Sequence, residues 1–252
     1  MMSSYPIFLQ PTRFERIKEA LPPLPPQPRK PKLIKKNWLE SLILWAEDQE
    51  DEMINAQRMM RYNIKLQQYQ EEVKRALSDT EVRIFRQRER DDFLRQASRG
   101  TQLLRDVKKG RYEQMFGDVL RGAFGGKIHT DIEFELPNGN GYVPDFAYVD
   151  EATGLCIDIE IDEPYSMPEK QPIHFVGEDD YRNCYFMDNG WFIVRFAEEQ
   201  IANQPNACLG YIRGVIDNIL QNSEVNVTPV PVSRWDYFDA RRYAEFDYRN
   251  TY

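Results

Sequence analysis

Three acidic residues in one short stretch have a spacing that suits a metal site. Residues 155–162 read Leu-Cys-Ile-Asp-Ile-Glu-Ile-Asp, so Asp158, Glu160 and Asp162 alternate with isoleucines. In a β-strand this alternation puts the three carboxylates on one face, about 6.5 to 7 Å apart. Like charges at that separation repel by about 2 kcal/mol per pair at an effective dielectric near 20. A divalent cation held by oxygen ligands removes this cost.

A predicted hairpin brings a further carboxylate to the same place. Residues 142–149 are rich in aromatic and β-branched types, and a turn separates them from the acidic strand. Strand pairing then sets Asp145 beside Glu160, and with the backbone carbonyl of Ile161 they form a cradle for Mg²⁺ or Mn²⁺. Asp162 or Glu113 is expected to complete this metal site directly or through water. The alternative is a strand with one solvated acidic face and no ion.

The order of several motifs resembles the PD-(D/E)XK nuclease superfamily. Pro144-Asp145 followed by Glu160-Ile161-Asp162 is similar to its signature of an Asp and an acid-x-Lys. Further along, the order of a histidine, an Asp-x-x-Arg motif and a Gly-Trp-x-x-Val-Arg-Phe strand resembles the Vsr-like branch. These motifs contain His174, Asp179, Arg182, Gly190 and Arg195. The resemblance covers about residues 111 to 203.

This resemblance implies a restriction-endonuclease-like α/β core, a mixed central sheet flanked by helices. It also implies metal-dependent hydrolysis of phosphodiester bonds, with DNA as the expected substrate. One departure is that Asp162 occupies the position of the signature lysine. Either the attacking water is activated without a lysine, or Lys170 or Lys127 assists from elsewhere in the chain.

Other residues are expected near the substrate. Glu113 lies beside the apolar stripe of a predicted helix, 111–124, and in the superfamily this helix often points a glutamate into the metal site. A first-turn glutamate favoured by the helix dipole is the alternative. His174 is a candidate for contact with the substrate or leaving group, or else an ordinary packed histidine. The residues expected to bind nucleic acid are Arg182, Arg195 and Lys127, and an ion pair with an acid is the alternative for the arginines.

Length and composition restrict the function classes. The 252 residues can bury one good core and carry an appendage. Three cysteines without metal spacing predict a reducing compartment, and two histidines exclude a His-rich zinc site. No apolar run approaches the roughly 20 residues of a membrane helix, and the first residues do not resemble a signal peptide. We therefore expect a cytoplasmic protein that does not bind membranes.

The net charge of −8 is unevenly distributed. Residues 1–99 contain 19 Lys and Arg against 15 Asp and Glu, whereas residues 100–252 contain 14 against 26. An acidic catalytic part repels nucleic acid, because attraction to phosphate dominates the affinity for DNA. The basic part of the chain could supply that attraction, and solvated charge on helices is the alternative.

The N-terminal part is predicted to be extended and then helical. Residues 1–36 form a proline-rich basic strap, because dense proline favours polyproline structure. From Asn37 to Leu77, apolar residues alternately four and three apart predict a long helix with one packed seam. Ser78-Asp-Thr-Glu81 matches a capping box, so a second helix follows. Residues 37–110 are therefore a helical hairpin or coiled-coil arm, suited to a homodimer or a partner protein.

The nuclease core is predicted over 111–222. Its first strand is 128–136, and the acidic strand is followed by a helix capped by Asp179 and a parallel strand, 191–196. Helical segments at 197–203 and 206–222 follow. Residues 223–252 form a linker and an aromatic C-terminal helix that packs on the rest.

Two other function classes fit the same residues. A catalytically silent nuclease fold would serve as an interaction module, and the absent signature lysine and the acidic core favour it. A coiled-coil subunit of a nucleic-acid-processing complex would use the arm alone. Nucleic acid is the expected partner in each case.

Overall fold

The computed structural model describes residues 4–35, 45–102, 110–137 and 139–252. Contacts between residues divide the chain into two compact units. The larger unit joins Met1–Arg16 to Arg90–Tyr252 and contains the sheets, and the smaller unit is Ile17–Glu89. The boundaries of these two units differ from the segment boundaries predicted from the sequence, which follow residues 36, 110 and 222.

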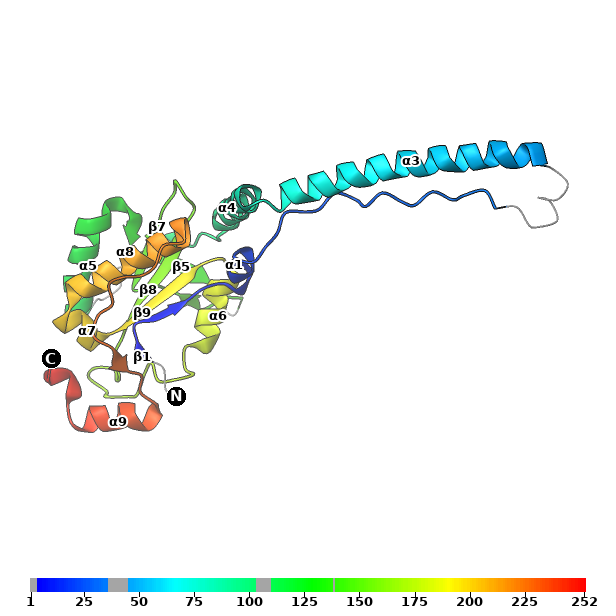
Figure 1. Ribbon diagram of the computed structural model, residues 1–252. Coiled ribbons are helices and arrows are strands. Elements are labelled where there is room, and N and C mark those ends of the chain that lie inside the picture. Colours follow the sequence, from blue (N-terminus) through cyan, green and yellow to red (C-terminus); the bar gives the residue numbers. More distant parts are fainter. Residues whose placement is uncertain (1–3, 36–44, 103–109, 138) are drawn as a thin grey trace. The chain divides into compact units, whose positions relative to one another are not determined.

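A five-stranded mixed sheet forms the centre of the larger unit (Figure 1). Strand β8 pairs antiparallel with β7 and parallel with β9, and helix α6 (Asp180–Asp188) is the crossover that a parallel pair requires. The predicted hairpin and the predicted parallel strand after it are therefore confirmed. In sheet order the strands are β2 (Ile7–Leu9), β9 (Phe192–Ala197), β8 (Cys156–Asp162), β7 (Phe146–Val149) and β4 (Ile128–His129).

The two faces of this sheet differ as the alternation in β8 predicts. The isoleucines of β8 lie on the apolar face, where Phe116 of helix α5 (Arg111–Phe124) packs edge-on against Phe146 and Phe196. The carboxylates lie on the opposite face, toward α6. All seven residues of β8 are buried, so the alternative of a solvated acidic face is wrong.

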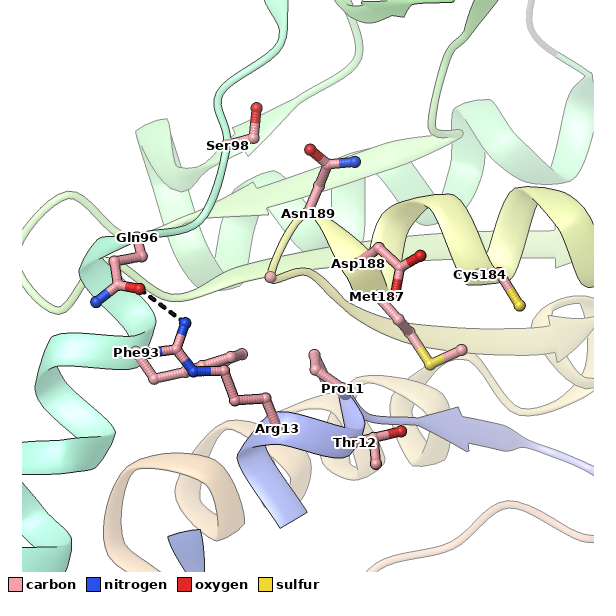
Figure 2. Close-up of a pocket in the computed structure, with 11 residues that line it drawn as sticks. Pro11, Thr12, Arg13, Phe93, Gln96, Ser98, Cys184, Met187, Asp188 and Asn189 are labelled. Atoms are coloured by element: carbon pink, nitrogen blue, oxygen red, sulfur yellow. Dashed lines mark hydrogen bonds between the residues drawn. The ribbon is translucent and has the colours of Figure 1, made fainter. Parts of the chain in front are cut away.

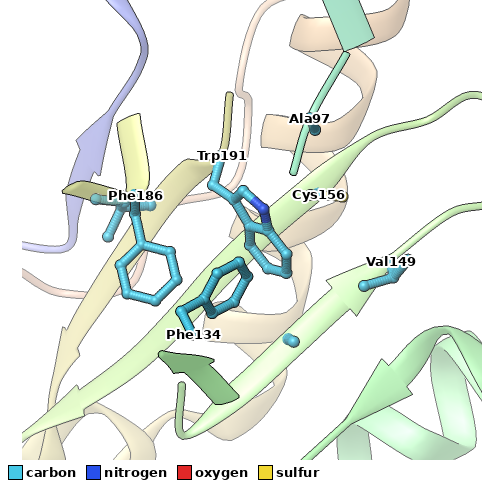
Figure 3. Close-up of a cluster of buried hydrophobic side chains, with 8 residues drawn as sticks. Ala97, Phe134, Val149, Cys156, Phe186 and Trp191 are labelled. Carbon is cyan, nitrogen blue, oxygen red and sulfur yellow. The ribbon is translucent and has the colours of Figure 1, made fainter. Parts of the chain in front are cut away.

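The acidic face of the sheet becomes apolar toward the start of β8. Phe134, Phe186 and Trp191 form an aromatic cluster there, with ring centroids 5.0, 5.1 and 5.8 Å apart (Figure 3). Trp191 is fully buried, and its Nε1 donates to the carbonyl of Ser98 at 2.7 Å. This packing confines the charged side chains to the C-terminal end of β8.

Helices α7 (Glu198–Asn203) and α8 (Pro205–Gln221) follow β9, close to the predicted bounds. A one-turn helix, η1 (Gly125–Lys127), joins α5 to β4. Among the described residues, no helix combines the length and the apolar composition that a membrane crossing needs.

The first residues depart from the predicted strap of 1–36. Strand β2 is an edge strand antiparallel to β9, and β1 (Ser4–Tyr5) pairs with β10 (Val232–Ser233). Helix α1 (Thr12–Ile17) follows. The apolar run before residue 10 suffices for short strands, and the dense proline on which the strap prediction rested begins only at Pro22.

The predicted first strand, 128–136, is two strands in different sheets. Strand β4 belongs to the central sheet, whereas β5 (Ile132–Glu135) lies between β3 (Thr101–Gln102) and β6 (Gly141–Tyr142) in a three-stranded sheet. One continuous apolar pattern therefore corresponds to two strands that belong to different sheets. Strand periodicity alone does not show where the chain passes from one sheet to the other.

Residues 223–252 contain helix α9 (Tyr237–Glu245) and a one-turn helix, η2 (Tyr248–Asn250). Trp235, before α9, packs on Tyr5 with ring centroids 5.1 Å apart. Its Nε1 donates to the carbonyl of Ile173 at 3.1 Å, and its carbonyl accepts the N–H of Val176 at 3.0 Å. Trp235 therefore holds the loop between β8 and α6.

The smaller unit contains α3 (Trp45–Ala76) and the first part of α4 (Asp79–Arg95). Helix α4 begins at the predicted capping box, where Ser78 Oγ accepts the N–H of Glu81 at 3.5 Å. The predicted start of the long helix, at Asn37, lies outside the described residues. The partly buried seam of α3 follows the predicted steps of four and three. It runs through Asn55, Met59 and Tyr62, whereas counting these steps from Trp38 predicts positions 56, 59 and 63.

Gly154, in the turn between β7 and β8, has a φ of +82°. A Cβ at this position would lie 2.8 Å from the carbonyl oxygen of Leu94. We therefore expect Gly154→Ala to lower the free energy of unfolding by about 2 to 3 kcal/mol, from backbone strain plus overlap. Gly139→Ala is the control, because φ there is +80° and no heavy atom of the described chain lies within 4 Å of the added Cβ. Equal losses for both variants in urea unfolding would contradict a tight contact at Leu94.

Candidate functional site

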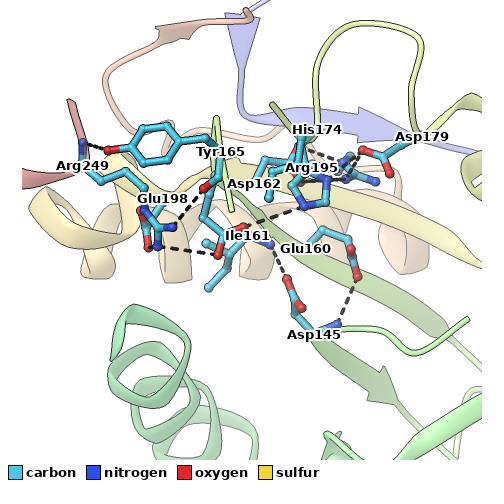
Figure 4. A network of polar contacts seen from close by, with 12 residues as sticks. Asp145, Glu160, Ile161, Asp162, Tyr165, His174, Asp179, Arg195, Glu198 and Arg249 are labelled. Atoms are coloured by element: carbon cyan, nitrogen blue, oxygen red, sulfur yellow. Dashed lines mark hydrogen bonds and ion pairs between the residues drawn. The ribbon is translucent and has the colours of Figure 1, made fainter. Parts of the chain in front are cut away.

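The hairpin of β7 and β8 brings Asp145 and Glu160 together (Figure 4). The backbone N–H of Asp145 donates to Glu160 Oε1 at 3.1 Å. In return, Asp145 Oδ2 accepts the backbone N–H of Ile161 at 2.8 Å. Asp145 is half-buried, and Glu160 is 5% exposed. The pairing that the sequence predicts between these two acids is therefore present, next to the Ile161 backbone.

Glu160 also forms a two-point ion pair with Arg182 of α6. Arg182 Nη1 lies 2.6 Å from Oε2, and Nη2 donates to Oε1 at 2.7 Å. Burial raises the pKa of Glu160, but Arg182 and Arg195 lower it by more, to about 2. The carboxylate therefore stays ionised although it is buried.

Asp158 is the third acid on this face, and it lies deepest. It is fully buried, and its Oδ2 lies 3.4 Å from Arg182 Nη1. Burial raises the pKa of Asp158 well above its usual value, and the neighbouring Glu160 carboxylate raises it further, against the opposing effect of Arg182. Of the acids in this row, Asp158 is therefore the one whose surroundings favour the neutral form.

Asp162 belongs to a second cluster, centred on Arg195 of β9 (Figure 4). Arg195 donates from Nε and Nη2 to the two oxygens of Asp162 at 2.9 and 2.6 Å. Nη2 also donates to Asp179 Oδ2 at 2.7 Å, and Nη1 to Asn183 Oδ1 at 3.0 Å. The hydroxyl of Tyr5 donates to Asp162 Oδ2 at 2.9 Å. Of the two predicted roles of Arg195, the ion pair with an acid is the one observed.

His174 closes this second cluster from the loop after β8. Its Nδ1 lies 3.0 Å from Asp179 Oδ2 and 3.7 Å from Asp162 Oδ1, and its Nε2 lies 3.7 Å from Glu163. Burial lowers the pKa of His174, but Asp162 and Asp179 more than offset this and raise it to about 10. The imidazole is therefore a cation at neutral pH.

Asp179 has a different role from the predicted helix cap. It occupies the N-cap position of α6, but its side chain makes no capping hydrogen bond. Its carboxylate instead contacts His174 and Arg195, and these two cations outweigh burial and lower its pKa to about 2. A buried guanidinium and a partly buried imidazolium attract the carboxylate more strongly than a single backbone N–H.

Asp162, His174 and Asp179 offer three potential metal ligands within 4.8 Å of one another. Nη2 of Arg195 lies 2.6, 3.3 and 2.7 Å from their ligand atoms. A divalent cation among them would meet a buried guanidinium at contact distance, where like charges repel strongly. This group therefore fits a metal ion only if Arg195 moves away.

Asp145 and Glu160 fit a hard cation better by their donor chemistry. Both offer carboxylate oxygens, which Mg²⁺ and Mn²⁺ prefer. Glu160 Oε1 accepts the N–H groups of Asp145 and Arg182, and Oε2 lies 2.6 Å from Arg182 Nη1. Asp158 also interacts with this carboxylate. A metal ion would therefore share the Glu160 oxygens with these neighbours.

Neither lysine expected to replace the signature lysine contacts the acids. Lys170 forms an ion pair with Asp247, and Lys127 with Asp150 at 3.1 Å. Lys127 precedes β4, whose pairing with β7 puts it at the far end of β7 from Asp145. In the structure both lysines therefore pair with other acids, and a catalytic role for either stays a prediction.

Glu113 lies on the side of α5 that borders a cavity of about 290 Å³. Phe146, the residue after Asp145, lines the same cavity. The charge of Glu113 also helps to raise the pKa of Glu163, which burial brings to about 7. Glu113 therefore borders a cavity beside Phe146, and its place at the metal site stays a prediction.

Several contacts of these clusters come from residues that sequence reasoning missed. Tyr5 lies 157 positions from Asp162, and no local pattern links the two. Near the C-terminal end, Arg249 forms a two-point ion pair with Glu198 at 2.7 and 2.5 Å, and Tyr252 donates to the same carboxylate at 2.8 Å. An isolated tyrosine or arginine in a polar segment gives no signal of such distant pairing.

A cavity of about 410 Å³ lies elsewhere on the larger unit (Figure 2). Its walls are the start of α1, the residues after α4 and the C-terminal end of α6, and Arg13 donates there to Gln96 Oε1 at 2.9 Å. None of the acids of β8 lines it. This cavity of about 410 Å³ therefore does not coincide with the acidic clusters of β8.

Comparison of the chain with protein-family models, with curated proteins and with solved structures finds no match. The protein is thus defined by its own features. It is an α/β protein with a five-stranded mixed sheet flanked by helices. The central strand carries a buried acidic row that pairs with two arginines.

Proposed function

We propose that this protein is a metal-dependent phosphodiester hydrolase, a nuclease of the restriction-endonuclease type that acts on DNA. The observation that carries the proposal is the meeting of Asp145 and Glu160 across β7 and β8, beside the Ile161 backbone. The motif order that resembles the PD-(D/E)XK superfamily, and the central mixed sheet, support the same conclusion.

In this proposal Asp145 and Glu160 hold Mg²⁺ or Mn²⁺, with the Ile161 carbonyl beside them. The ion would lower the pKa of a bound water and stabilise charge on the phosphate under attack. Arg182 is a positioning residue, because its two-point pair fixes the Glu160 carboxylate. Asp162 is reassigned from metal ligand to positioning residue, because its oxygens already accept Arg195 and Tyr5.

The remaining charges are suited to a phosphodiester. His174 is cationic and partly exposed at the mouth of its cluster, so it can contact a phosphate oxygen or give a proton to the leaving group. Glu113 borders the neighbouring cavity and is the further acid available to the metal site. Both roles are parts of the proposal.

The test is a cleavage screen over single-stranded DNA, double-stranded DNA and RNA with Mg²⁺ or Mn²⁺. We expect cleavage that EDTA abolishes and that Asp145→Asn or Glu160→Gln lowers by more than about 100-fold. Glu151→Gln is the matched control, since Glu151 is an exposed acid in the turn between the same two strands. Undiminished cleavage by Glu160→Gln would refute the assignment.

A second candidate function is a catalytically silent nuclease fold that acts as an interaction module. The observation in its favour is that Glu160 and Asp162 each form a two-point pair with a buried arginine, so the row needs no metal for charge balance. This candidate predicts nucleic-acid binding without cleavage under every metal condition of the screen.

A further inference from the structure

In the smaller unit, an extended strap, residues 20–35, runs beside α3 (Figure 1). Every third residue from Pro22 to Ile34 is partly buried, and its neighbours are exposed. This period is the three-residue turn of polyproline II. In α3, the residues from Asn55 to Ala76 that are alternately four and three positions apart are partly buried, and they form its seam. The partner of α3 is therefore the strap and not the second helix of a predicted hairpin.

Three side-chain contacts fix the strap in register on the helices. Asn55 pairs with both backbone groups of Ile34, accepting its N–H at 2.9 Å and donating to its carbonyl at 3.1 Å. Arg58 donates to the carbonyl of Lys32 at 3.0 Å, and Arg86 to that of Ala20 at 2.9 Å. The residues on the outer sides of the strap therefore have defined positions along α3.

Many of the exposed positions in one part of the strap and in the adjacent part of α3 carry basic side chains. Segment 29–35 contains four cations, and segment 53–70 of α3 contains three, with no Asp or Glu in either segment. The cations of the strap are Arg29, Lys30, Lys32 and Lys35. Those of α3 are Arg58, Arg61 and Lys65. All seven are exposed, and within the described part of the chain none forms an ion pair with a carboxylate.

The two basic segments cover the same length of the arm. Seven residues of polyproline II extend about 22 Å, and 18 residues of α-helix extend about 27 Å. The contact between Ile34 and Asn55 aligns their ends. The sequence interrupts these cations with acids only beyond this stretch, at residues 50–52 and 71–72. The cations of the strap and of α3 therefore lie along the same length of the arm, and we call these seven residues the basic ridge.

We propose that the basic ridge is a binding surface for the phosphate backbone of double-stranded nucleic acid. An unpaired row of seven cations on a stiff rod complements the regular phosphates of a duplex. A membrane surface is a poorer match, because the apolar seam of α3 faces the strap and the exposed apolar residues, such as Met60 and Ile64, stand among polar side chains. The proposal extends the proposed nuclease function, whose acidic core would otherwise repel its substrate.

The test compares two double variants of the full chain that remove equal charge from the same helix. Arg61→Gln/Lys65→Gln removes two cations of the ridge, and Lys74→Gln/Arg75→Gln removes two exposed cations beside Glu71 and Glu72. Glutamine keeps helix propensity, and circular dichroism checks that helicity is retained. Binding to a fluorescein-labelled 20-base-pair DNA duplex is measured by anisotropy in EDTA, over a range of salt concentrations.

We expect the ridge variant to weaken binding by at least about 5-fold at 0.1 M salt and to reduce the salt slope by about 2. The control variant should stay within about 2-fold of the unmodified chain. Equal effects of both variants, or no effect of the first, would overturn the proposal, as would binding to phosphatidylserine vesicles in place of the duplex. Because no metal is present, cleavage does not enter the measurement, so loss of the nuclease assignment would leave this result standing.

Discussion

Replacing Arg195 by methionine is expected to lower the free energy of unfolding by about 3 to 5 kcal/mol. The Arg195 side chain is 2% exposed and forms a two-point pair with Asp162, which is equally buried. Removing the guanidinium leaves a buried carboxylate with the hydroxyl of Tyr5 as its hydrogen-bond donor and His174 Nδ1 3.7 Å away. The cost arises mainly from that poorly compensated charge rather than from lost packing, because methionine fills a similar volume.

The double variant Asp162→Asn/Arg195→Met separates these two contributions. It removes both charges of the pair, so we expect it to recover a large part of the stability that the single variant loses. Arg241→Met is the control at an exposed arginine, 65% accessible and paired with Glu245 at 3.5 Å, where the effect should stay within about 0.5 kcal/mol. Urea unfolding measures all three variants. A double variant as unstable as the single one would contradict a charge-based cost.

His174 is expected to make stability fall as the pH rises through the alkaline range. The pKa of His174 is about 10 in the folded chain, against 6.5 as the ordinary value. Below pH 6.5 the imidazole is protonated in both states, so its stabilisation is fully present. Between pH 6.5 and 10 only the folded state retains the proton, and the stabilisation, on the order of 5 kcal/mol, is lost progressively.

The substitution His174→Gln should therefore destabilise the protein strongly at pH 6 and little at pH 10. The groups that face the imidazole are the Asp162 and Asp179 carboxylates, Glu163, whose pKa is about 7, and the Arg195 guanidinium. His129→Gln makes the same change at the other histidine, in the edge strand β4, and should leave the difference between pH 6 and pH 10 as in the unmodified chain. Chemical unfolding in EDTA at the two pH values measures the effect. A cost of His174→Gln that does not depend on pH would contradict the charged imidazole.

Glu160 and Asp179 are expected to make the stability of the folded chain fall at low pH. Glu160 and Asp179 have pKa values of about 2 in the folded chain, below their ordinary 4.5 and 3.8. Their stabilisation is therefore present above pH 4.5 and is lost as the pH falls toward 2. Together with His174, these groups put their combined maximum between about pH 4.5 and 6.5.

Local patterns in the sequence were sufficient to predict the centre of the fold. The alternation of Asp158, Glu160 and Asp162 with isoleucines fixes the two faces of β8, because the side-chain period of a strand is two. The capped helix and the apolar strand after it predict the crossover to β9. These features depend on neighbours in the chain, and the structure confirms them.

What compensates the acidic row was not predictable in the same way. The sequence suggested a metal ion, whereas Arg182 and Arg195 neutralise Glu160 and Asp162 in the structure. Each arginine was an expected nucleic-acid ligand with an ion pair as the alternative, and only the fold shows that both point at the acids. Tyr5 and the edge strand β2 are likewise long-range partners of this region, because their pairing spans most of the chain.

The apolar seam of α3 was predictable from the sequence, but the segment that packs against this seam was not. A seam with steps of four and three needs an apolar surface against it, and a second helix is the usual partner. Here a polyproline segment supplies that surface, with Pro22, Pro25, Pro28 and Pro31 at its three-residue period. The same sequence feature was predicted as a strap, but its docking on α3 required the coordinates.

Calorimetric titration of Mn²⁺ into the full chain at neutral pH is the most direct test of the metal site at Asp145 and Glu160. The account predicts one binding site that Asp145→Asn weakens by more than about 10-fold and that the control Glu151→Gln leaves unchanged. A titration without binding heat would contradict the account. So would binding that survives Asp145→Asn but is lost in Asp179→Asn, because the ion would then lie in the cluster around Arg195.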